Sequence, residues 1–185
     1  MREKPQILNT EIRAKTRSFT VEAVDLRFSN GTEVQFERLV GSGQGAVLVV
    51  PMLDDTTVLL TREYSAGVHR YELALPKGRI EPGEDKLVAA NREIMEEIGY
   101  GARKLEHIIS LTLAPAYQSH HTHVILAQDL YPQRMAGDEP EEIEVVPWRI
   151  DNLSELIAHD ECTEARSIAA LYIVRDLLNG RAGGA

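Results

Sequence analysis

The most informative part of this 185-residue sequence is Gly78-Arg-Ile-Glu-Pro-Gly-Glu84, followed after seven residues by Arg92-Glu-Ile-Met-Glu-Glu-Ile-Gly-Tyr100. From Asp85 to Ile98 the apolar residues recur with the period of an α-helix, and the stripe consists of Leu87, Ala90, Ile94 and Ile98. Gly99 follows as a plausible helix stop. The sequence therefore predicts a loop that leads into a helix carrying several carboxylates.

Two of these carboxylates are placed against each other. Glu93 and Glu97 lie four residues apart, so they are neighbours on one helix face, beside the apolar stripe. Like charges at this spacing repel, and partial burial strengthens the repulsion. A hard divalent cation removes the conflict, because Mg²⁺ prefers oxygen ligands and binds one or two carboxylates together with substrate phosphates. An ordinary solvated acidic helix is the alternative interpretation.

The composition limits the classes of partner. Asp and Glu number 29 against 20 Lys and Arg, a net charge of −9, which disfavours non-specific binding to nucleic-acid polymers or to a membrane surface. The single cysteine, Cys162, excludes an internal disulfide and indicates a reducing compartment. The N-terminus does not resemble a signal peptide, and the longest apolar run, Ala46–Leu53, is too short to span a membrane. We expect a soluble, cytoplasmic protein.

The pattern along the chain predicts two regions. Residues 1–44 read as antiparallel strands, because Val24–Phe28 alternates apolar and polar residues and a turn at Ser29–Thr32 precedes a second alternation. Residues 45–185 then mix strands with helices. The expected strands are Ala46–Met52, Thr57–Arg62, Tyr71–Pro76, Leu105–Leu113 and Thr122–Ala127, and the expected later helices are Leu153–Ala158 and Glu164–Leu178. Without a regular βαβ alternation, this order predicts an α+β fold with a mixed sheet.

A glycine-rich segment between the regions invites another interpretation. Gly41–Ala46 fits the dinucleotide-binding pattern G-x-G-x-x-A. That pattern requires a helix after the glycines, whereas here a β-branched run follows. We interpret Gly41–Gly45, including Ser42, as a linker.

The stretch quoted first resembles the Nudix box, G-x5-E-x7-R-E-U-x-E-E-x-G-U, in which U is a bulky apolar residue. All seven fixed positions match, namely Gly78, Glu84, Arg92, Glu93, Glu96, Glu97 and Gly99. The chain is thus identified as a member of the Nudix hydrolase family, in its ADP-ribose pyrophosphatase branch. The resemblance implies a mixed β-sheet sandwiched between helices. It also implies hydrolysis of a nucleoside diphosphate linked to another group, with Mg²⁺ or Mn²⁺.

The resemblance also implies roles for individual residues. Its metal ligands would be Glu93, Glu96, Glu97 and the backbone carbonyl of Lys77. Glu96 and Glu97 would also take part in catalysis, with Arg92 orienting the glutamates. A second acidic run, Gly137–Val145, which includes Asp138, resembles the acidic loop of ADP-ribose pyrophosphatases. By that likeness Glu139 is the expected general base and Glu141 an additional metal ligand, with Glu142 the alternative base.

The substrate is indicated by weaker likenesses. Pro115 stands where ADP-ribose hydrolases have a proline, and Tyr117 where diadenosine polyphosphate hydrolases have a tyrosine. A wider pattern resembles a bacterial branch that releases AMP from ADP-ribose, NADH and diadenosine polyphosphates; it comprises Arg62–Tyr64, Tyr71–Leu73, Leu113–Tyr117, Ala127–Pro132 and Glu164–Arg166. That branch implies a homodimer in which the N-terminal strands, residues 1–44, help to complete the partner's substrate site.

One substrate contact is left open by the sequence. Many ADP-ribose hydrolases have R-Q-[FY]-R where this chain has Arg62-Glu63-Tyr64-Ser65, so the second arginine is missing. Arg38 or Arg62 could supply the cation beside the diphosphate, with Glu63 next to it. Two other functions also stay open. One is a catalytically silent Nudix-fold sensor of ADP-ribose or NAD, and the other is a Nudix hydrolase of a nucleoside triphosphate or coenzyme A.

Overall fold

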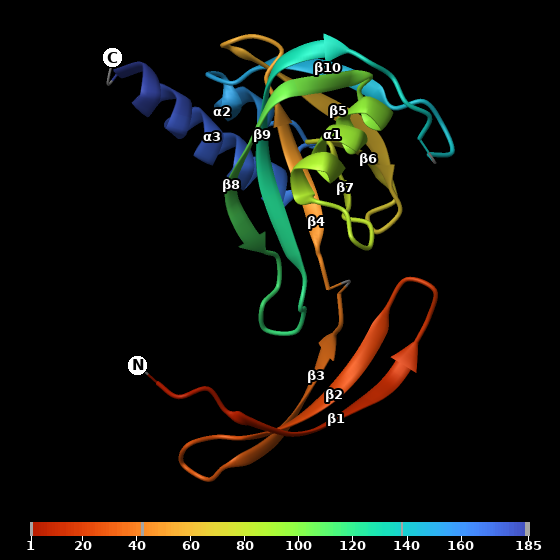
Figure 1. Ribbon diagram of the computed structural model, residues 1–185, viewed down its shortest axis with the longest axis vertical. Helices are drawn as coiled ribbons and strands as arrows, with labels where there is room; N and C mark the ends of the chain where they lie inside the picture. Colours follow the sequence, from red (N-terminus) through yellow and green to blue (C-terminus); the bar gives the residue numbers. More distant parts are fainter. Residues whose placement is uncertain (1, 42, 138, 184–185) are drawn as a thin grey trace. The chain divides into compact units, whose positions relative to one another are not determined.

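The computed structural model describes residues 2–41, 43–137 and 139–183, so Ser42 of the predicted linker and Asp138 of the acidic run lie outside the described residues. The chain divides into two compact units, and each is described by itself. One unit contains the residues up to Gly45 together with Thr112–His121, and the other contains Ala46–Leu111 and the chain from Thr122 onward (Figure 1).

The first unit is an antiparallel three-stranded sheet in the order β1-β2-β3. Its strands are β1 (Gln6–Lys15), β2 (Thr20–Arg27) and β3 (Glu33–Leu39). The predicted antiparallel strands are confirmed, since Val24 pairs with Phe36 across β2 and β3. The turn between these strands uses Gly31, whose φ of +82° favours glycine.

In the described residues, the second unit contains two sheets and three helices. The mixed sheet has the order β7-β4-β9-β8, with β4 parallel to β9 and antiparallel to β7. The antiparallel sheet has the order β10-β5-β6. The strands of this unit are β4 (Ala46–Pro51), β5 (Thr57–Ser65), β6 (Arg70–Ala74), β7 (Lys77–Arg79), β8 (Tyr100–Thr112), β9 (His121–Pro132) and β10 (Glu144–Arg149). The helices are α1 (Lys86–Glu97), α2 (Leu153–Leu156) and α3 (Ala165–Gly183).

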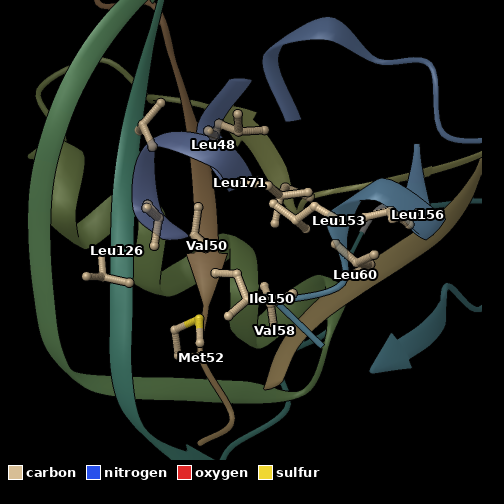
Figure 2. Close-up of a cluster of buried hydrophobic side chains, with 14 of the residues drawn as sticks. Leu48, Val50, Met52, Val58, Leu60, Leu126, Ile150, Leu153, Leu156 and Leu171 are labelled. Carbon is tan, nitrogen blue, oxygen red and sulfur yellow. The ribbon is translucent and has the colours of Figure 1, made fainter. Parts of the chain in front are cut away.

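Two hydrophobic clusters pack helices against the two faces of the mixed sheet. All six residues of β4 are buried, as expected of a strand that is covered on both sides. Leu48 and Val50 point into a cluster that includes Leu171 of α3 (Figure 2). Val47 and Val49 point the other way, into a cluster with the apolar face of α1. The predicted α+β fold, a mixed sheet sandwiched between helices, is confirmed.

Helix α1 has the predicted boundaries. The Asp85 side chain caps it by accepting the Leu87 amide at 2.8 Å, and Gly99 ends it with a φ of +73°. Helix α3 differs from the prediction, because it continues past Asn179-Gly180 to Gly183. A glycine ends a helix only where it adopts the left-handed conformation, and within a helix it costs only about 1 kcal/mol. Among the described residues, no helix is long and apolar enough to cross a membrane.

Candidate active site

The site begins where α1 crosses β7. The Glu93 carboxylate lies directly against Gly78, and a Cβ atom at Gly78 would fall only 2.0–2.1 Å from the atoms of that carboxylate. A side chain at the first glycine of the box would therefore have to displace the Glu93 carboxylate, whereas the backbone angle of Gly78 is an ordinary one.

Glu97 is the most deeply buried carboxylate of the box, with 4% of its surface exposed. It accepts the backbone amide of Lys77 at 3.3 and 3.4 Å. The pKa of Glu97 is raised to about 9, chiefly by burial; the cation of Lys77 opposes this shift, and the negative charges of Glu63 and Glu93 add to it. The Lys77 ammonium also contacts Glu63 at 3.1 Å. At neutral pH, the Glu97 carboxyl group therefore carries a proton unless a bound cation replaces that proton.

Glu93 is nearly as buried, at 7% exposed, and pairs with Nη1 of Arg92 at 2.8 Å. Burial raises its pKa; Arg92 opposes the shift, and the negative charges of Glu96 and Glu139 add to it. The influence of Glu139 is informative, because it brings the acidic loop close to the box helix. The negative charge of Glu139 thus acts on one carboxylate of the box, Glu93.

Arg92 ties the loop of the box to the helix. Its guanidinium donates to both carboxylate oxygens of Glu84 at 3.0 and 3.2 Å, and to the backbone carbonyl of Arg79 at 2.9 Å. It also contacts Glu96 at 3.0 Å. This pairing lowers the pKa of Glu84, which accepts the Glu81 amide as well. The predicted orienting role of Arg92 has a geometric basis in these bonds.

The carboxylates suit a hard divalent cation by their chemistry. In the parts of the chain that the structure describes, no three His, Cys, Asp or Glu side chains converge closely enough to hold a metal ion. The reason is visible in their partners, because Arg92 lies within 3.0 Å of both Glu93 and Glu96 while Glu97 turns to the Lys77 amide. A divalent ion would compensate the buried negative charge that raises the pKa values of Glu93 and Glu97.

The acidic residues outside the box helix, Glu63 and those of the acidic loop, line a separate cleft. This cleft has a volume of about 50 Å³ and is lined by Arg62, Glu63, Tyr64 and the loop residues 139–143. Glu141, the expected additional ligand, accepts the Tyr71 hydroxyl at 2.6 Å, which raises the pKa of Tyr71. Glu142 is exposed. Glu139 therefore lines this cleft beside Glu63, and the loop residue Glu141 is tied to β6 by its bond to Tyr71.

The expected substrate-binding residues fall into two places. In the first unit, Arg38, Pro115 and Tyr117 line one cavity of about 350 Å³, and Arg38 is paired with Glu22 at 2.7 Å. In the second unit, Arg62 pairs with Glu144 at 2.7 Å and with Glu161 at 3.1 Å. Both arginines already have carboxylate partners, with which a phosphate would compete.

Two contacts of the site were not predicted. The Lys77–Glu63 pair joins residues 14 positions apart, and the Tyr71–Glu141 bond joins residues 70 positions apart. Neither contact has a spacing or periodicity that sequence reasoning could recognise. Tyr71 and Glu141 stood out only as parts of separate motifs.

Replacing Gly78 with alanine tests the close packing of the box. The new methyl group would displace the Glu93 carboxylate, and we expect the free energy of unfolding to fall by about 1–3 kcal/mol. Urea unfolding measures this loss. Gly67→Ala is the matched control, because a Cβ atom there meets nothing within 4 Å, so its effect should stay within about 0.5 kcal/mol. Equal effects of the two substitutions would refute the packing argument.

The raised pKa of Glu97 has a consequence for stability. Its ordinary value is 4.5 and its value in the fold is about 9, so between these limits the folded chain holds a proton that the unfolded chain has released. The free energy of unfolding should therefore fall as the pH rises through this window, by up to about 1.4 kcal/mol per pH unit.

This expectation is measured by urea unfolding in EDTA between about pH 5 and pH 8, comparing the wild type with Glu97→Gln. The variant cannot titrate at this position, so its stability should decline less steeply. Glu155→Gln, at an exposed position, should follow the wild type. Parallel curves for Glu97→Gln and the wild type would contradict the assigned pKa.

Comparison with known proteins places these features in a family. Residues 5–38 match the N-terminal domain of NudE-type Nudix hydrolases, and residues 43–171 match the NUDIX domain. The chain is 45% identical over 179 residues to the ADP compounds hydrolase NudE of Escherichia coli, covering 97% of this chain and 96% of that protein. It is 27% identical to the ADP-ribose pyrophosphatase of Bacillus subtilis, covering 88% and 90%.

A solved structure agrees with the sequence comparison. The crystal structure of an ADP compounds hydrolase, 44% identical, superposes with a TM-score of 0.90 and covers 98% of this chain and 97% of its own. The similarity therefore extends over both units as well as the box. This protein belongs to the Nudix hydrolase family and carries a NudE-type N-terminal domain.

Proposed function

We propose that this protein hydrolyses the diphosphate linkage of ADP-containing compounds, namely ADP-ribose, NADH and diadenosine polyphosphates, and releases AMP. The observation that carries the proposal is the burial of Glu93 and Glu97 beside each other, with raised pKa values, within an intact Nudix box. The name and the 45% identity of the Escherichia coli relative support the class of substrate. The complete set of box glutamates favours an enzyme over a silent sensor.

The site requires a divalent cation, Mg²⁺ or Mn²⁺. We assign Glu93 and Glu97 as its main ligands, with Glu96, Glu141 and the backbone carbonyl of Lys77 as further ligands. When bound, such an ion neutralises the diphosphate and activates the attacking water. Oxygen donors alone make up this set, as Mg²⁺ and Mn²⁺ prefer.

The proton of the attacking water needs an acceptor, and Glu139 is our choice. It is half-buried, and its charge acts on Glu93, so its carboxylate lies near the other carboxylates of the site. Glu139 takes the water proton as the new bond to phosphorus forms, and the bond between that phosphorus and the bridging oxygen breaks. Arg92 holds Glu93 and Glu96 in place through its bonds to Glu84 and Arg79.

We assign substrate binding to residues of both units. Arg38, Pro115 and Tyr117 share one cavity, in which a tyrosine ring and an arginine can contact a base or a phosphate. Arg62 and Glu63 line the cleft beside the acidic loop.

We also propose a cytoplasmic homodimer in which the N-terminal strands contribute to the partner's site. The first unit leaves many apolar side chains exposed, which is typical of a surface that another chain covers. These side chains include Ile7, Ile12, Phe19, Phe36 and Tyr117.

The proposal is tested by analysing the products formed from ADP-ribose, NADH, diadenosine triphosphate and coenzyme A with Mg²⁺. We expect AMP from the first three and no reaction without a divalent ion. Glu97→Gln should lower kcat by at least about a hundredfold, since it removes a metal ligand, while the circular dichroism spectrum stays unchanged. Glu3→Gln, at an exposed position, serves as the control.

Three results would overturn the proposal in different ways. Tight binding of ADP-ribose without products would indicate a sensor. Cleavage of coenzyme A alone would indicate another substrate. Normal turnover by Glu97→Gln would remove this residue from the metal site.

The role of Glu139 has its own test. Glu139→Gln should lower kcat by about 10²–10⁴-fold and flatten the acidic limb of the pH–rate profile, because the variant cannot accept the proton. Glu141→Gln and Glu142→Gln, made in parallel, should keep that limb. Full activity of Glu139→Gln would instead transfer the role of base to one of these two residues.

A further inference from the structure

Two tyrosines face solvent beside the acidic loop. Tyr64 of β5 and Tyr71 of β6 are paired across the two strands, and their surfaces are 43% and 44% exposed. Their rings meet edge to face with centroids 5.8 Å apart. Exposed aromatic pairs of this kind mark contact sites for ligands or partners.

The rings are held in position by bonds of their hydroxyl groups. The Tyr64 hydroxyl is hydrogen-bonded to Nδ1 of His69, and the Tyr71 hydroxyl donates to Glu141 at 2.6 Å. His69 adopts a φ of +54°, an uncommon conformation for a residue with a side chain, which positions the imidazole beneath the Tyr64 hydroxyl. A ring that is fixed before the ligand arrives loses little entropy on binding.

The tyrosine pair borders the reacting end of the site. Tyr64 lines the same cleft as Glu63 and Glu139. Glu63 is paired with Lys77, next to Glu97, and the charge of Glu139 acts on Glu93. A substrate whose diphosphate lies at these carboxylates can therefore extend along the cleft and bring a second group to the tyrosines.

We propose that Tyr64 and Tyr71 form a stacking platform for the second base of a dinucleotide substrate. This inference rests on the proposed function and adds the part of the site that distinguishes between substrates. A planar base can lie on an exposed tyrosine face, as bases do on aromatic side chains in single-strand binding proteins. ADP-ribose carries only one base, so it gains nothing from this platform, whereas NADH and diadenosine triphosphate carry two.

The test compares kcat/KM for ADP-ribose, NADH and diadenosine triphosphate in Tyr64→Leu, which removes the ring but leaves the Tyr71–Glu141 bond. We expect kcat/KM to fall by about 5–100-fold for the two dinucleotides and by less than about twofold for ADP-ribose. Tyr64→Phe keeps the ring face and should retain the preference of the wild type. Val68→Ala, in the exposed turn that follows β5, is the matched control and should change none of the three values.

The outcomes separate this inference from the proposed function. An equal loss for all three substrates, or no loss for any, would overturn the platform, since a merely structural role does not distinguish substrates. ADP-ribose turnover reports on folding within the same variant.

If the wild type releases no AMP from any compound, the proposed function fails. NADH and ADP-ribose binding, titrated with Ca²⁺ in place of Mg²⁺, then decides the platform. Weaker NADH binding alone in Tyr64→Leu supports it, and unchanged binding overturns it.

Discussion

The contact between Glu93 and Gly78 is the constraint on which the rest of the site depends. It places a carboxylate of α1 so close to β7 that a side chain at the first residue of the box would have to displace it. Because Glu93 and Glu97 share the buried side of α1, the same packing that buries the apolar stripe also buries two carboxylates. The free energy of apolar burial thus offsets the cost of desolvating charges, and leaves them ready for a cation.

A second layer of contacts keeps this arrangement in one geometry. Glu84, from the loop, and Arg92, from the helix, form a two-bond ion pair that fixes the loop against the first turns of α1. A guanidinium is suited to this role, because its rigid fork satisfies two carboxylate oxygens and still reaches other acceptors. The box is therefore a single packed and hydrogen-bonded unit, which explains why its residues occur at fixed spacing.

The sequence predicts those features of the structure that depend on residues close together along the chain, such as helices, strands and turns. The helix at α1, its glycine stop, the strand at β2 and the buried run of β4 follow from periodicity and turn chemistry, and the structure confirms them. The end of α3 was predicted wrongly, because a glycine can stay within a helix when the surrounding residues favour it. Contacts between distant strands, such as Tyr71 with Glu141, have no local signal and appear only once the sheets are assembled.

The acidic loop carries both the proposed base, Glu139, and a residue bonded to the proposed tyrosine platform, Glu141. Glu139 and Glu141 are two residues apart, yet one acts on Glu93 and the other is held by Tyr71. Both carboxylates belong to one short segment, so the Tyr71–Glu141 bond anchors the backbone that also carries Glu139. A base that stacks on the tyrosines would therefore steady the loop that carries Glu139, and binding energy far from the phosphorus would be used to position the proton acceptor.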